Sequence, residues 1–230
     1  MAPDKLIAWS LVVPVKVLAR AKSRLVGLAG EDRAALVLAM AADTVAAALA
    51  SPSVAAVIVV SDDQAVRREL ASIGAVVVAD QPGAGLNSAL MFGAEHAAAR
   101  WPARGRAALT ADLPAMTAAE LSGALTAAST ATQAFVPDSA GSGTTLYTAG
   151  PGVAFRPRFG ALSRAEHLRA GATELALPEI SGLRQDVDTL DDLRIAASIG
   201  LGRRTAGILA EAAPEGPRAS RDPRARCGEH

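Results

Sequence analysis

The feature that most constrains this chain is its alternation of short apolar runs with longer helical patterns. The runs are rich in Val, Leu or Ala and continuous rather than alternating, which is typical of strands buried on both faces of a sheet. They cover residues 9–15, 56–60, 75–79 and 106–110, and helical patterns occupy roughly residues 31–50, 62–73 and 87–100. This order predicts an α/β fold with a parallel, doubly wound sheet and right-handed crossovers.

The pattern changes in the second half of the chain. A helix is predicted at about residues 117–128, where Thr117 and Glu120 have the spacing of a capping box. Strand-like runs then follow at residues 133–137, 144–149 and 173–177, and a last helix begins near Leu190 with Thr189 as its cap. Antiparallel or mixed strands are therefore expected to join the parallel sheet, which is flanked by helices.

The 230 residues suffice for one main domain, expected at residues 1–202, and the Arg- and Pro-rich residues 203–230 are expected to form a flexible tail. Only 3% of the residues are aromatic and the net charge is zero, which argues against nucleic acid or a membrane surface as partner. No run is expected to approach the length needed to span a bilayer and no signal peptide is evident, so a cytoplasmic protein with a small-molecule ligand is predicted. The single cysteine, Cys227, excludes an intrachain disulfide.

Three cationic residues follow the first predicted strand. Lys16 and Lys22 are two of only three lysines in the chain, and Arg24 lies beside them. Ligands of open α/β sheets bind beyond the carboxyl ends of the strands, so these charges are placed to neutralise a phosphate chain. A solvated basic loop is the alternative.

A glycine-containing loop follows the third predicted strand. Gly83 and Gly85 permit close approach of a ligand to the backbone, and Asn87 is placed either to cap the next helix or to present its amide to a base. The glycine spacing does not match a dinucleotide fingerprint, and a plain turn with a helix cap explains the loop equally well.

Carboxylates occupy two further positions of interest. Asp112 follows the fourth predicted strand and precedes Pro114, while Asp186 and Asp188 flank Val187 and point to the same side of an extended segment. Oxygen ligands of this kind suit Mg²⁺, with phosphates and water completing the coordination. The alternatives are a turn cap for Asp112 and unrelated surface acids for the pair. His96 and His167 have no acid or nucleophile at a telling spacing, so surface or packing roles are predicted for both.

Six segments in order resemble the guanylyltransferases of coenzyme F420 biosynthesis. They span residues 9–202 and comprise Pro14-Val-Lys16, Ala21-Lys22-Ser-Arg24-Leu25, Asp112-Leu-Pro114, Gly143-Thr144, Arg158-Phe159-Gly160 and Asp186-Val-Asp188-Thr189. The resemblance implies a single Rossmann-like nucleotidyltransferase domain of the GT-A type. It also implies transfer of GMP from GTP to a phosphorylated three-carbon acid, with release of pyrophosphate.

The resemblance also implies roles for particular residues. Asp112, Asp186 and Asp188 would bind Mg²⁺, and Lys16, Lys22 and Arg24 would contact the GTP phosphates. Thr144, Gly160 and Ser163 would line the acid pocket, and the loop of Gly85 and Asn87 would contact guanine. One departure is Ala111, because relatives usually have Gly before the strand-end aspartate.

The resemblance leaves the acid substrate open between phosphoenolpyruvate, 2-phospho-L-lactate and 3-phospho-D-glycerate. The Ala- and Arg-rich composition is typical of a GC-rich bacterium, for which the resemblance implies phosphoenolpyruvate. A downstream phospholactate-type transferase is the expected consumer of the product, and a homodimer is left open. A molybdopterin- or sugar-type nucleotidyltransferase and a non-catalytic nucleotide-binding regulator are the alternative functions.

Overall fold

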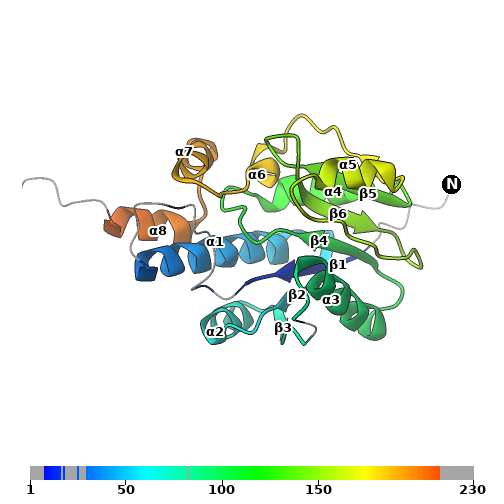
Figure 1. Cartoon of the computed structure of the whole chain (residues 1–230), viewed down its shortest axis with the longest axis horizontal. Coiled ribbons are helices and arrows are strands. Elements are labelled where there is room, and N and C mark those ends of the chain that lie inside the picture. Colours follow the sequence, from blue (N-terminus) through cyan, green and yellow to red (C-terminus); the bar gives the residue numbers. More distant parts are fainter. Residues whose placement is uncertain (1–7, 17, 19–24, 26–29, 82, 213–230) are drawn as a thin grey trace, which may run out of the picture.

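The computed structural model describes residues 8–16, 18, 25, 30–81 and 83–212, and these form one mixed seven-stranded sheet between helices (Figure 1). The strands are β1 Trp9–Pro14, β2 Val54–Val60, β3 Val76–Val78, β4 Gly105–Leu109, β5 Gln133–Pro137, β6 Thr144–Ala149 and β7 Thr173–Glu174. The helices are α1 Gly30–Ala50, α2 Gln64–Ser72, α3 Leu86–Arg100, α4 Ala118–Ala128, α5 Ser163–Arg169, α6 Ser181–Arg184, α7 Leu190–Ile199 and α8 Arg203–Ala212.

The sheet confirms the predicted α/β architecture. Its strand order is β3-β2-β1-β4-β6-β5-β7, with β1 pairing in parallel with β2 and β4. The central strand β1 is buried along nearly its whole length, which explains its continuous apolar sequence. Strand β6 is antiparallel to both of its neighbours, β4 and β5, so the expected mixed elements do join the sheet.

Two large hydrophobic clusters cover the two faces of the sheet, and a small third one joins β2 to α3. The larger cluster packs α1, α2, α4, α6 and α7 against one face, while α3 and the segment that follows β6 cover the other. Helix α3 lies very close to the sheet, because a Cβ on Gly93 would be 2.5 Å from Val12 Cγ1. Both predicted caps are present as capping boxes, formed by Thr117 with Glu120 at α4 and by Thr189 with Asp192 at α7.

Helix α1 corrects one expectation drawn from the sequence. Its residues Glu31–Ala50, with a mean hydropathy of 1.6, are long and apolar enough to span a membrane by length and composition alone. However, 56% of this stretch is buried inside the structure, since α1 packs on the sheet and on α8. The composition therefore fits the central helix of a packed core.

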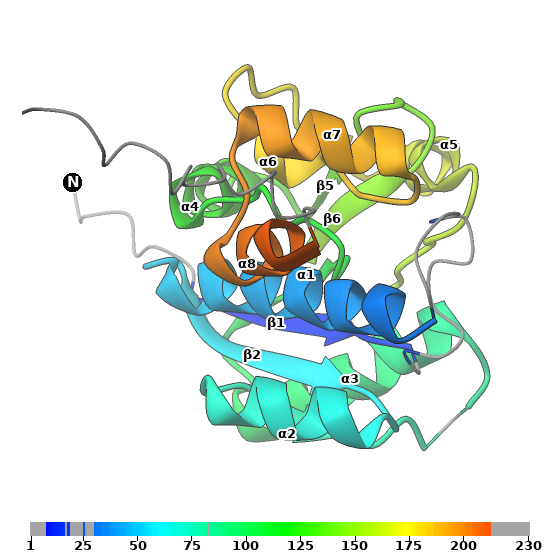
Figure 2. The same ribbon diagram turned by 90° about the vertical axis from the view of Figure 1, so that its left-hand side faces the viewer.

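The flexible tail was predicted to begin at residue 203, but a further helix begins there. Residues 203–212 form α8, which packs across α1 (Figure 2). The carboxylate of Asp43 on α1 accepts hydrogen bonds from the backbone N–H groups of Arg204, at 3.1 Å, and Thr205, at 2.8 Å. A side chain 161 residues away therefore caps α8, and Ile208 and Leu209 pack against the larger cluster. The remainder of the predicted tail lies outside the described residues.

Candidate active site

The predicted site residues come from elements that end or begin at one edge of the sheet. Lys16, an exposed residue, follows β1, and the turn with Asp112 follows the neighbouring strand β4. Because β6 runs in the opposite direction to β4, its first residue, Thr144, lies at this same edge. The hydrogen bond from Thr110 N–H to the Thr145 carbonyl, at 3.0 Å, joins the two segments beyond the paired strands. Lys22 and Arg24 lie outside the described residues.

The turn that carries Asp112 is held by a threonine of α1. The buried hydroxyl of Thr44 accepts a hydrogen bond from Leu113 N–H at 3.1 Å, and its proton has the carbonyl oxygens of Met40, at 2.9 Å, and Ala111, at 3.3 Å, as acceptors. Thr44 is therefore hydrogen-bonded to the backbone on both sides of Asp112. Ala111 is accommodated, since it is partly buried and packs against the larger hydrophobic cluster. No local sequence pattern indicated this role for Thr44.

The segment with Asp186 and Asp188 lies against the Asp112 turn. Val187 N–H donates to the Asp112 carbonyl at 3.1 Å, and the Val187 side chain is fully buried. In an extended segment, the residues on either side of an inward-facing valine point the opposite way. Asp186 is half-buried and Asp188 is exposed. The backbone hydrogen bond from Val187 therefore joins the two segments that carry Asp112, Asp186 and Asp188.

Contacts just before this segment fix its position. Gly182 N–H donates to Glu120 Oε1 at 2.7 Å, and a Cβ on Gly182 would be 2.2 Å from the Ala115 carbonyl oxygen. The Arg184 guanidinium donates to the carbonyl oxygens of Pro137, at 3.2 Å, and Asp138, at 2.9 Å. Helix α6 is thereby attached both to α4 and to the end of β5.

The carboxylates meet the requirements of Mg²⁺ in chemistry but do not form a complete cage. Among the described residues, no group of three or more His, Cys, Asp or Glu side chains is arranged to hold a metal ion by itself. Mg²⁺ commonly binds through one or two carboxylates together with substrate phosphates and water. Asp112, Asp186 and Asp188, drawn together through Val187, fit that form of binding.

The residues predicted to bind the acid gather around a buried histidine. Thr144 and Ser163 are buried, and Ser163 N–H donates to the Gly160 carbonyl at 3.1 Å. Within the described part of the chain, the buried Ser163 Oγ has no hydrogen-bonding partner. An unsatisfied buried hydroxyl is uncommon, and a bound ligand is one way to satisfy it. Thr144 Oγ1 lies 3.0 Å from His167 Nδ1.

His167 is fully buried, as its predicted packing role requires, but it also makes polar contacts that the sequence did not reveal. Its Nε2 accepts a hydrogen bond from Arg158 N–H at 3.0 Å. Burial, followed by the nearby Arg158 charge, lowers the pKa of His167 to about 4, despite opposing contributions from the Ser163 backbone and Glu166. The imidazole is therefore neutral at pH 7.

Asn87 does not lie as expected for a residue that recognises guanine. Its Oδ1 accepts a hydrogen bond from Phe159 N–H at 2.8 Å, and its Nδ2 donates to the Phe159 carbonyl at 3.0 Å. Its side chain also leaves α3 uncapped, since Gly85, with φ of 99°, occupies the cap position without a side-chain hydrogen bond. The amide instead anchors the loop of residues 158–160 to α3. A contact between Gly85 and the nucleotide stays a prediction.

Asp63 holds the segment after β1 in place, a role that the sequence did not indicate. It caps α2 through the backbone N–H groups of Ala65 and Val66, and its Oδ2 accepts from Leu18 N–H at 3.0 Å. Burial raises the pKa of Asp63, but the hydrogen bonds from Leu18, Val66 and Ala65 outweigh it and leave the pKa below its usual value. Asp63 thus ties the segment after Lys16 to α2.

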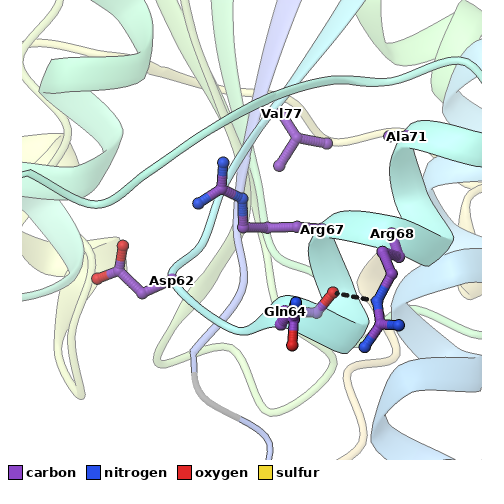
Figure 3. Close-up of a pocket in the computed structure, with 6 residues that line it drawn as sticks. All are labelled: Asp62, Gln64, Arg67, Arg68, Ala71 and Val77. Carbon is purple, nitrogen blue, oxygen red and sulfur yellow. Dashed lines mark hydrogen bonds between the residues drawn. The ribbon is translucent and has the colours of Figure 1, made fainter.

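A pocket of about 660 Å³ lies elsewhere, between α2 and the edge strand β3 (Figure 3). It contains none of the predicted site residues and is lined by Asp62, Gln64, Arg67, Arg68, Ala71 and Val77. Arg68 Nε donates to the Gln64 carbonyl at 3.4 Å, so one of its two arginines is engaged locally. Asp62 follows the carboxyl end of β2, and the other lining residues belong to α2 and β3.

Comparison with known proteins agrees with this arrangement. In sequence, a protein of Streptomyces coelicolor named "Phosphoenolpyruvate guanylyltransferase" is 56% identical over 203 residues, covering 88% of this chain and 96% of that protein. One of the same name from Thermomonospora curvata is 54% identical over 207 residues, covering 90% and 91%.

Solved structures share the fold. A protein of Desulfovibrio desulfuricans G20 has a TM-score of 0.68 at 19% identity, covering 88% of this chain and 94% of its own. A nucleotidyl transferase from Methanothermobacter thermautotroptrophicus has a TM-score of 0.60 at 20% identity, covering 84% and 97%. The family model described as "Guanylyl transferase CofC like" matches residues 9–195. The chain therefore belongs to the CofC-like guanylyl transferase family of nucleotidyltransferases.

Proposed function

We propose that this protein transfers GMP from GTP to phosphoenolpyruvate in coenzyme F420 biosynthesis. A phosphate oxygen of phosphoenolpyruvate attacks the α-phosphorus of GTP, the bond from that phosphorus to the bridging oxygen of the β-phosphate breaks, and pyrophosphate leaves. The relatives at 54–56% identity that carry this name support the choice of substrates. The observation that carries the chemistry is the hydrogen bond from Val187 to Asp112, which joins the acidic segments at the edge where Thr144 lies.

The acceptor phosphate is already an anion, so the reaction needs no side chain to remove a proton from it. The main difficulty is electrostatic, because two anionic substrates must approach and a third anion must leave. Lys16, with Lys22 and Arg24, is proposed to contact the GTP phosphates, and Gly85 to approach the nucleotide. Lys16 is exposed at the end of the central strand, where its ammonium can reach a bound ligand.

Mg²⁺ is the metal that we propose for Asp112, Asp186 and Asp188. When bound, it would neutralise charge on the triphosphate and so weaken the repulsion between the substrates. The protein's part is to hold the carboxylates, through the Thr44 contacts to the Asp112 turn and the Glu120 contact to Gly182.

Thr144, Gly160 and Ser163 are proposed to bind the phosphorylated acid. The buried hydroxyls of Thr144 and Ser163 can donate hydrogen bonds to phosphate or carboxylate oxygens in a region shielded from water. Shielding from water strengthens each of these bonds.

The test is pyrophosphate release from GTP with Mg²⁺ and each acid in turn: phosphoenolpyruvate, 2-phospho-L-lactate and 3-phospho-D-glycerate. We expect the highest kcat/KM with phosphoenolpyruvate, measured with the downstream transferase present because the product is expected to be labile. A nucleotide product containing a sugar or molybdopterin would identify the alternative transferase activity. Tight GTP binding without turnover of any acid would identify a regulator and refute the proposal.

Single variants separate the acidic site from the neighbouring surface charge. Asp112→Asn and Asp186→Asn should each lower kcat/KM by about 100-fold or more. Asp191→Asn is the matched control, because Asp191 is an exposed acid in the first turn of α7, where it pairs with Arg194. Equal losses in the control and the site variants would contradict the assignment. The cytoplasmic location, the homodimer and the delivery of product to a downstream transferase stay predictions.

A further inference from the structure

His167 connects the parts of the proposed acid pocket through both of its ring nitrogens. Nε2 accepts a hydrogen bond from Arg158 N–H, so Nε2 carries no proton. A neutral imidazole then has its proton on Nδ1, and Nδ1 lies 3.0 Å from Thr144 Oγ1. The ring therefore donates to Thr144 and accepts from the Arg158 backbone.

This tautomer determines what Thr144 can offer to a ligand. Nδ1 carries the ring proton, which the Ser163 backbone and Thr144 Oγ1 can both accept, so the hydroxyl proton of Thr144 cannot point at the ring. The hydroxyl is thereby oriented as a donor toward other acceptors, which suits an anionic phosphate or carboxylate oxygen. The protonated ring would remove the acceptor that Arg158 N–H uses.

Packing fixes the plane of the imidazole. The Tyr147 ring stacks on it with centroids 4.8 Å apart and planes 14° apart, and Phe135 lies 5.4 Å away. Phe159 meets it edge-on at 5.7 Å. A ring held from three sides cannot turn to exchange its two hydrogen bonds without disturbing the core of this face of the sheet.

The same ring also fixes the loop that carries Gly160. His167 binds the Arg158 backbone and contacts the Phe159 ring, while Asn87 holds the Phe159 backbone from α3. Ser163 lies one helical turn before His167 on α5. All three residues proposed to bind the acid are therefore positioned by contacts that converge on His167.

We propose that His167 is a positioning residue for the phosphorylated acid: as the Nδ1–H tautomer it orients the Thr144 hydroxyl and holds the loop with Gly160. This inference rests on the proposed function of that pocket. His167 does not touch the reacting atoms, so its removal acts on binding of the acid and leaves binding of GTP intact.

The test compares His167→Phe, which keeps a ring and removes both hydrogen bonds, with His167→Asn, whose amide can still donate to Thr144. We expect His167→Phe to raise KM for phosphoenolpyruvate at least tenfold with KM for GTP changed less than twofold, and His167→Asn to recover part of the loss. His96→Asn is the control, since His96 is exposed on α3. In a protein that already carries Thr144→Val, His167→Phe should raise KM for the acid by a smaller factor than it does in the unmodified protein. The reason is that the Thr144 and His167 side chains share one hydrogen bond.

The outcomes are distinguishable from failure of the proposed function. If the unmodified protein turns over none of the three acids, the proposed function fails and the inference fails with it. If it turns over phosphoenolpyruvate and both KM values rise equally in His167→Phe, or neither rises, only the inference is overturned. Thermal unfolding shows whether each variant folds. If His167→Phe does not fold, the KM values of His167→Asn for the acid and for GTP are compared with those of the unmodified protein instead.

Discussion

Replacing Thr44 by valine removes the side-chain clamp on the Asp112 turn while nearly preserving side-chain volume. The substitution deletes the acceptor of the buried Leu113 N–H and the donor to the Met40 and Ala111 carbonyls. Leaving a buried donor without a partner costs about 1–3 kcal/mol, and a lost hydrogen bond adds about 1 kcal/mol. We therefore expect Thr44→Val to lower the free energy of unfolding by about 2–4 kcal/mol, and Tm by roughly 4–16 °C.

The chain offers a matched control in Thr205. It is likewise a buried helical threonine, but its Oγ1 has no hydrogen-bonding partner among the described residues. Thr205→Val should leave stability unchanged or raise it by up to about 1 kcal/mol, because no hydrogen bond is lost. Equilibrium unfolding in urea measures both. Equal destabilisation by the two substitutions would refute the reasoning, since the cost would then come from the extra methyl group and not from the Thr44 hydrogen bonds.

Three further predictions concern packing, capping and protonation. Gly93→Ala should destabilise by about 1–3 kcal/mol in urea unfolding, because the new Cβ would meet Val12, whereas Gly123→Ala on α4, with nothing within 4 Å, should not destabilise. Asp43→Ala should speed hydrogen exchange in α8 far more than in β1, since α8 loses its cap. His167, with its pKa lowered to about 4 by burial and Arg158, stabilises the protein fully above its unfolded-state pKa of about 6.5. That contribution, about 3 kcal/mol, should disappear as the pH falls from 6.5 to 4, and the pH dependence of unfolding should be shallower in His167→Asn.

Local patterns predicted much of the fold. The continuous apolar runs identified the buried strands, and the threonine and acid spacings identified two helix starts that the structure confirms. The general rule that ligands bind beyond the carboxyl ends of strands directed attention to Asp112. The structure then showed that one backbone hydrogen bond, from Val187 to Asp112, joins this turn to the segment of Asp186 and Asp188.

Contacts between distant segments account for what was missed. Helix α8 begins where Asp43 supplies its cap, and no local sequence feature shows that. A signal did exist in Thr205, Ile208 and Leu209, whose spacing suits one helical face. The contact of Asn87 with the Phe159 backbone could not be predicted locally, since that backbone lies 72 residues further along the chain; its contact with guanine stays a prediction.

The attachment of the Asp186 segment has a consequence for biosynthesis of the protein. Strand β4 and the Asp112 turn belong to the first half of the chain, but Asp186, Asp188 and α8 are made last. A nascent chain emerging from the ribosome can build the parallel half of the sheet early and still lack two of its three acidic residues. The contact between Val187 and the Asp112 turn thus forms only after nearly the whole chain has been made, and shorter chains contain β1, β2 and β4 without it.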